Sequence, residues 1–85
     1  MEVTRRGILF IDHEGLVLLC ESMKLSKPPQ PGRGRIVVLD LDYSGVPLRT
    51  HAGYRWSWSG TVEIRGVVED DYLRAVAPAM LIPEQ

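Results

Sequence analysis

This sequence of 85 residues has little cysteine, little histidine and almost no net charge, and each shortage excludes something. Its one cysteine, Cys20, cannot form an internal disulfide, and it lies in an apolar run where it would pack as a small hydrophobic residue. A reducing, cytoplasmic location is therefore expected. The net charge of −1 provides no overall field to attract polyanions or a membrane surface.

Membrane-spanning segments, targeting segments and catalytic motifs are missing as well. The first apolar stretch is broken at Asp12, so it is too short to span a membrane, and no small-residue cleavage site follows it. No glycine pattern for nucleotides, no nucleophile elbow and no zinc-ligand spacing occurs. The sequence predicts a single domain over residues 1–85 that has no enzymatic activity, no cofactor and no membrane partner.

Three short runs, at residues 8–11, 16–20 and 36–39, are apolar at every position. Strands built from them would carry apolar side chains on both faces. A domain of this size buries only about 60–65% of its surface, so a single copy would have difficulty covering three such strands. The surplus favours self-association or binding to another protein.

The first half of the chain is typical of β-structure. Residues 3–12 and 15–22 predict a hairpin, because Asp12 and Gly15 occupy the first and fourth positions of a type I turn. Residues 23–35 hold three prolines and two glycines, which predicts a flexible loop. A third strand is expected from about Arg35 to Tyr43.

Residues 54–68 alternate with a period of two. Tyr54, Trp56 and Trp58 fall on the same parity as Val62 and Ile64, which predicts one aromatic face. Parity favours a hairpin with a three-residue loop at residues 59–61, and one long strand bent at Gly60 preserves the same parity. In the hairpin, Arg55 and Arg65 would be neighbours on the opposite face.

The end of the chain contains the only candidate helix. Acidic residues 69–71 suit a helix N-terminus, and an apolar stripe follows as far as Pro78. Residues 79–82 are expected to form a terminal edge strand before Pro83. The predicted fold is therefore mainly β, a small antiparallel barrel or sandwich of five to six strands with one short C-terminal helix.

Few residues are candidates for metal chemistry. Asp40 and Asp42 would share one face of the third strand, where His13 or His51 could add a third ligand for a hard cation. A solvated strand end explains the two carboxylates more simply. Cys20 is expected to be buried and unreactive, since its neighbours are apolar.

Two groups of residues are candidates for binding. Tyr54, Trp56, Trp58, Arg55 and Arg65 would form a protein interface, because Trp, Tyr and Arg are frequent in interface hot spots. Lys24, Lys27, Arg33 and Arg35 lie along the proline-rich loop and could track phosphates, although the net negative charge disfavours nucleic acid.

The segment Gly34–Asp42, with four apolar residues before Asp40, is similar to an early strand of MazEF-type endoribonuclease toxins. The resemblance implies ribonuclease activity as one alternative. The first interpretation is a non-enzymatic interaction module, either a homo-oligomeric assembly subunit or a small inhibitor or adaptor of a larger complex. The alternative is a nucleic-acid-binding β-module or small endoribonuclease-toxin-like protein that uses the basic loop with Arg55 and Arg65.

Overall fold

The computed structural model describes residues 1–24, 30–31, 34–58 and 60–83, and these residues form strands and loops without a helix. The strands are β1 (Glu2–Ile11), β2 (Val17–Cys20), β3 (Met23–Lys24), β4 (Gln30–Pro31), β5 (Ile36–Leu39), β6 (Leu48–His51), β7 (Tyr54–Ser57), β8 (Thr61–Glu69), β9 (Tyr72–Ala75) and β10 (Met80–Ile82). The prediction of a mainly β domain is confirmed.

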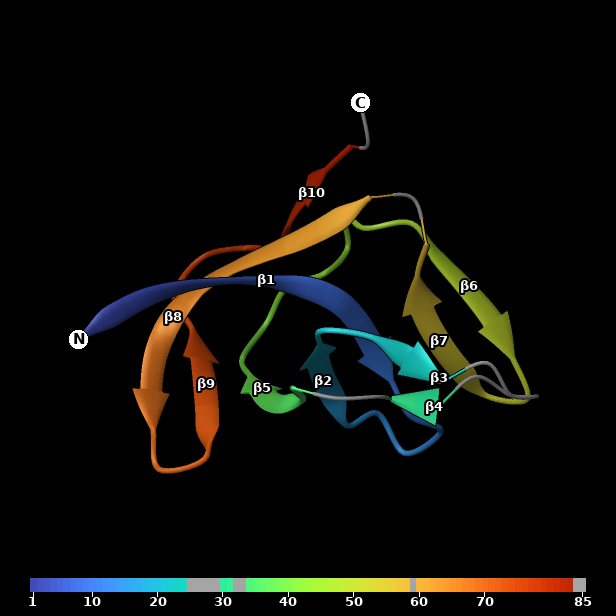
Figure 1. Cartoon of the computed structure of the whole chain (residues 1–85), viewed down its shortest axis with the longest axis horizontal. Coiled ribbons are helices and arrows are strands. Elements are labelled where there is room, and N and C mark those ends of the chain that lie inside the picture. The colour runs from blue at the N-terminus through green and yellow to red at the C-terminus, as the bar shows by residue number, and fades with distance from the viewer. Residues whose placement is uncertain (25–29, 32–33, 59, 84–85) are drawn as a thin grey trace.

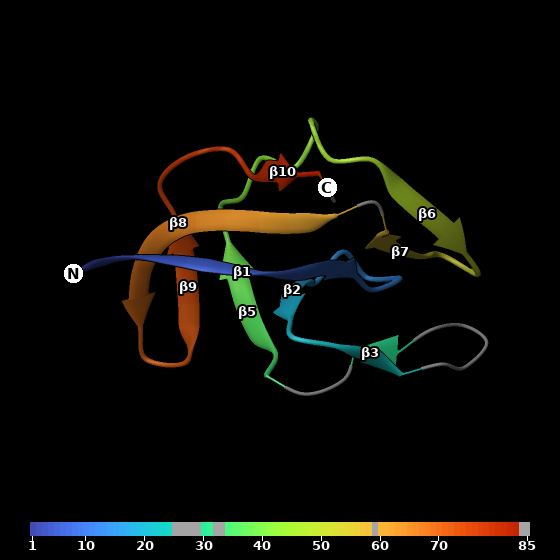
Figure 2. The same cartoon turned by 45° about the horizontal axis from the view of Figure 1, so that its top comes forward.

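Five of these strands close into a barrel. The order runs β8, β9, β5, β2 and β1, and β1 pairs with β8 to close the ring (Figures 1 and 2). All neighbours are antiparallel except β5 and β9, which run parallel. This is a small Greek-key type of barrel. The β6–β7 hairpin extends the sheet beyond β1, and β10 lies beside β8 at the other end.

Within the barrel, the first strand is shared between two neighbours, β8 and β2, which makes closure possible. Its residues 2–7 pair with β8 and its residues 8–11 pair with β2. Gly7 stands at the change of partner, where a Cβ atom would collide with the carbonyl oxygen of Cys20. Only glycine allows the two backbones to approach this closely.

The predicted hairpin at the start of the chain is confirmed. β1 pairs antiparallel with β2, and the Gly15 amide donates to the carbonyl of Asp12 at 3.0 Å. The carboxylate of Asp12 accepts two further bonds, from the amides of Glu14 and Leu16, each at 2.9 Å. The aspartate therefore stabilises its own turn.

The three-residue hairpin at residues 59–61 is wrong. The alternative of one bent strand gives the correct strand direction, but the parity that it preserves changes at the bend. Both β7 and β8 run antiparallel to β1: Phe10 pairs with Trp56, and Gly7 pairs with Val62. The segment that contains β7 and β8, and not β1, carries the extra residues at the bend. Gly60 has a φ of 117° there, and a Cβ atom would collide with the carbonyl oxygen of Ile82.

The predicted C-terminal helix is also wrong, because residues 69–75 form a tight β-hairpin between β8 and β9. Glu69 pairs with Tyr72, and Asp70 adopts a φ of 51° in the two-residue turn. Aspartate tolerates this left-handed conformation better than most residues. β9 fills the position between β8 and β5, so the barrel needs a strand here. The terminal edge strand, β10, is confirmed.

Two hydrophobic clusters cover opposite faces of the sheet that contains β1 and β2. The barrel interior holds Leu9, Ile11, Leu19, Val38, Val46, Val62, Ile64, Leu73 and Ala79. The outer cluster holds Phe10, Leu18 and Cys20, with Val37, Tyr54 and Trp56 packed against them. The doubly apolar runs are therefore largely covered within one chain, which reduces the surplus that the sequence suggested.

The proline-rich range lies partly within the described residues. There, β3 and β4 form a separate two-stranded ribbon in which Met23 pairs with Pro31 (Figure 1). Lys27 and Arg33 lie outside the described residues, as does the side chain of Lys24. The flexibility of this loop stays a prediction.

Candidate functional site

Trp58, which directly follows the β6–β7 hairpin, is the most exposed aromatic side chain among the described residues. Ala52 and Gly53 form the turn of this hairpin with φ values of 52° and 82°, the signature of a type I′ turn that matches the twist of the two strands. The register pairs Arg49 with Trp56 and His51 with Tyr54. Paired residues lie on one face of the sheet.

Arg49 and Trp58 form the centre of this site. The Arg49 guanidinium carbon lies 4.5 Å from the centroid of the Trp58 ring, and 51% of Trp58 is exposed. A guanidinium at this distance over an indole face makes a cation–π contact. We call Arg49, His51, Trp56 and Trp58 the Arg–Trp surface.

The five predicted interface residues do not form one surface. Tyr54 and Trp56 are partly buried in the outer cluster, and the Tyr54 ring lies 5.8 Å from Phe10. Trp58 is exposed. Trp56 and Val62 pack in different clusters, so the inward parity changes at the bend, contrary to the single aromatic face expected from alternation.

The two predicted arginines are separated for the same reason. Arg55 lies over the Tyr43 ring at 5.6 Å and donates to its hydroxyl at 3.3 Å. Arg65 donates to Glu2 at 3.0 Å on the outer face of β8. Since β7 and β8 run in the same direction, these residues are not cross-strand neighbours.

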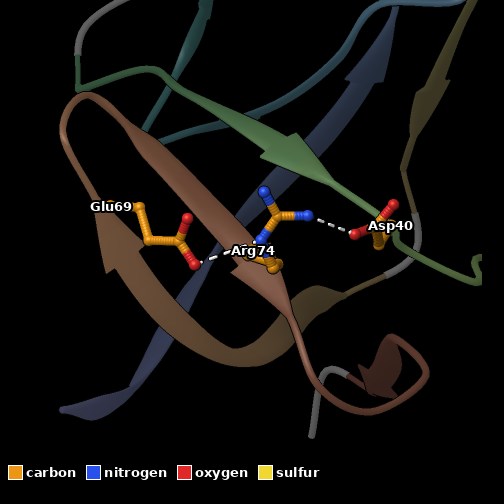
Figure 3. Close-up of polar contacts among 3 residues, drawn as sticks. All are labelled: Asp40, Glu69 and Arg74. Carbon is orange, nitrogen blue, oxygen red and sulfur yellow. Dashed lines mark hydrogen bonds and ion pairs between the residues drawn. The ribbon is translucent and has the colours of Figure 1, made fainter.

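The carboxylates considered as metal ligands have other partners. β5 ends at Leu39, and Asp40 has a φ of 58°, so Asp40 and Asp42 do not share a strand face. Arg74 bridges Asp40 at 2.6 Å and Glu69 at 3.1 Å, tying the end of β5 to β8 and β9 (Figure 3). These carboxylates raise the pKa of Arg74, Glu69 having the larger effect.

Asp42 caps a turn. Its carboxylate accepts the Ser44 amide at 3.0 Å, and this bond, together with one to the Ser44 side chain, lowers the pKa of Asp42. Among the described residues, no group of three or more His, Cys, Asp and Glu side chains is arranged to hold a metal ion. The structure brings together no metal site from these two aspartates.

The histidines and the cysteine have ordinary environments. His13 lies 3.7 Å from the carboxylate of Glu14 and packs edge-on to Tyr54, whereas His51 is exposed. Cys20 is buried as expected, and burial raises the pKa of its thiol, while the nearby Arg35 charge has a smaller, lowering effect. A raised pKa keeps the thiol protonated and poorly nucleophilic.

Of the four basic loop residues, Arg35 is the one whose side chain the structure describes. It lines a pocket with Arg5 and Arg6. Sequence reasoning did not single out Arg5, Arg49 or Ser57. Ser57 alternates with Trp56 and Trp58 in the sequence, yet it is 4% exposed and its hydroxyl accepts the Leu9 amide at 2.9 Å.

Comparisons with protein-family models, curated proteins and solved structures found no match to this chain. Nor do the described residues include a helix of the length and hydropathy that crossing a membrane would require.

Proposed function

We propose that this protein is a non-enzymatic interaction module that pairs with a second copy of itself through the β6 edge and the adjacent Arg–Trp surface. The exposed Trp58 ring held under Arg49 is the observation that carries the proposal. Tryptophan and arginine are the residues most enriched among energetic hot spots of protein interfaces.

The position of β6 supports edge pairing. β6 is an end strand of the eight-stranded order, so one of its edges has no partner strand in the described part of the chain. In a two-residue hairpin the pair beside the turn, His51 and Tyr54, is hydrogen-bonded, and bonded pairs alternate along the ladder. Leu48 and Thr50 therefore direct their backbone groups away from β7.

The other end of the sheet is less suited to pairing. β10 has three residues, and Pro83 follows it directly. A proline removes a backbone donor and discourages strand addition. β6 is longer, and antiparallel pairing of two β6 strands across a twofold axis would place the same groups of both copies in contact.

Sedimentation velocity over a concentration series tests this proposal. Trp58→Ala should weaken the dimer by at least about 2 kcal/mol, roughly thirtyfold in the dissociation constant. Tyr72→Ala is the matched control, because Tyr72 is similarly exposed at 43% but lies on the β8–β9 hairpin. Its dissociation constant should equal that of the wild type.

A second pair of variants tests the edge. Thr50→Pro removes an outward N–H without removing a β6–β7 bond, so it should abolish the dimer, whereas Thr50→Ala should not. Circular dichroism confirms that both variants stay folded. A chain that remains monomeric throughout the series, or a dimer that tolerates both Trp58→Ala and Thr50→Pro, contradicts the proposal.

Nucleic-acid binding is the second candidate function. The Arg5 and Arg35 side chains make no ion pair within the described residues, which leaves their charges available to phosphates. If a single-stranded oligonucleotide is the partner, Arg5→Gln should weaken binding and reduce its salt dependence. Fluorescence anisotropy over a salt series measures both.

A further inference from the structure

A pocket of about 590 Å³ opens on the side of the barrel, away from the β6–β7 hairpin. Its lining is Thr4, Arg5, Arg6, Leu19, Cys20, Glu21, Gly34, Arg35 and Ile36. These residues come from the first half of β1, the end of β2 and the start of β5. The pocket arises because β1 pairs with β2 only from Ile8 onward.

The positive charge of this pocket is not fully neutralised. Arg6 donates to Glu63 at 2.9 Å, so its charge is matched. The Arg5 and Arg35 side chains make no ion pair or hydrogen bond within the part of the chain that the structure describes. Glu21 is the one acidic side chain of the lining, which leaves two unpaired guanidinium groups against one carboxylate.

The remaining lining suits an organic group. Leu19 is a buried member of the barrel core and Ile36 is a partly buried residue packed against it, and both border the pocket. Sites for small molecules typically have volumes of about 300–1,000 Å³ with a few polar groups on an apolar lining. The observed volume lies in this range and exceeds what a bare inorganic anion needs.

We propose that this pocket binds a small organic phosphate of about nucleotide size. The Arg5 and Arg35 guanidinium groups bind the phosphate, since arginine donates paired hydrogen bonds to phosphate oxygens. The organic part rests on Ile36. This binding is independent of the dimer proposed above, because it uses none of the Arg–Trp surface.

A phosphate on a small molecule fits these charges better than a polynucleotide does. Binding along a strand needs successive unpaired cations beside the site. The next arginines on this surface, Arg6 and Arg65, are already held by Glu63 and Glu2. The free positive charge is therefore local to the pocket.

Isothermal titration calorimetry with adenosine monophosphate tests the proposal. Arg5→Gln and Arg35→Gln should each weaken binding about tenfold, the effect of losing one charge-assisted bond. Arg65→Gln removes the same charge outside the pocket and should leave affinity unchanged. Adenosine should bind at least about tenfold more weakly than its monophosphate, because it lacks the phosphate.

A second measurement locates the ligand. In a titration followed by amide NMR, the largest shifts should fall on residues 4–6 and 34–36. The proposal is overturned if adenosine or citrate binds as tightly as the monophosphate, if Arg65→Gln weakens binding as much as the pocket variants, or if only an oligonucleotide binds. Unchanged circular dichroism of the variants excludes unfolding as the cause of any loss.

Discussion

Replacing Ser57 by alanine should destabilise the fold more than replacing an exposed serine, although Ser57 falls between the aromatic residues in the alternating pattern. The Ser57 hydroxyl is buried and accepts the Leu9 amide at 2.9 Å. The β1–β7 ladder ends at the pair of Phe10 with Trp56. At the next position the Ser57 side chain, and not a β7 carbonyl, accepts the Leu9 amide. In Ser57→Ala the Leu9 amide loses its partner in a site that water does not reach.

The expected size follows from burial. A buried backbone donor left without a partner costs about 1–3 kcal/mol, whereas an exposed hydroxyl is replaced by water at little cost. Since about 1 kcal/mol shifts Tm by roughly 4–8 °C in a domain of this size, a loss of about 2 kcal/mol should lower Tm by roughly 8–16 °C.

Chemical denaturation of Ser57→Ala and Ser44→Ala measures the difference. Ser44 is exposed in a turn, so its alanine variant should lie within about 0.5 kcal/mol of the wild type. Amide exchange provides a local readout, because the Leu9 amide should exchange faster in Ser57→Ala alone. Equal stabilities of the two variants, with Leu9 still protected, would refute the hydrogen-bond argument.

Three further outcomes are expected. Ala52→Asn should stabilise the chain by about 1 kcal/mol in thermal denaturation, because Ala52 has a φ of 52° and asparagine tolerates that conformation better. A loss of stability would show that the alanine is not strained there. The pKa of Asp42 is lowered, so its carboxylate stabilises the fold fully at pH values above the ordinary pKa of 3.8. This stabilisation is lost as the pH falls through the lowered pKa. The stability difference between the wild type and Asp42→Asn should therefore shrink in acid, and a constant difference would disprove the linkage. Cys20 should react with iodoacetamide far more slowly in the folded chain than in denaturant, since burial raises its pKa, and equal rates would show an accessible thiol.

Local sequence patterns correctly predicted the features that depend on contacts between residues close together in the sequence. The turn from Asp12 to Gly15 was predictable, because its hydrogen bonds join residues only a few positions apart. The buried state of Cys20 followed from its apolar neighbours. The period of two over residues 54–68 correctly indicated extended chain, since alternation is a property of the strand itself.

The errors came where two conformations share one local pattern. Residues 69–77 satisfy a helical stripe, and residues 72–75 within them also alternate as a strand that buries Leu73 while Tyr72 stays exposed. β9 pairs with one edge of β5 and with one edge of β8. The sequence of residues 69–77 does not reveal that these two edges need a partner. The pocket was missed for a similar reason, since nothing near Arg5 in the sequence indicates that it lines one pocket with Arg35.

The sequence by itself determined that this chain forms short strands joined by tight turns, because alternation, β-branched residues and turn chemistry act over a few positions. Only the tertiary structure decided which strands are neighbours, that residues 54–69 bend around β1, and which arginines keep an unpaired charge. Those outcomes depend on closing one long, shared strand into a barrel, and closure is a property of the whole chain.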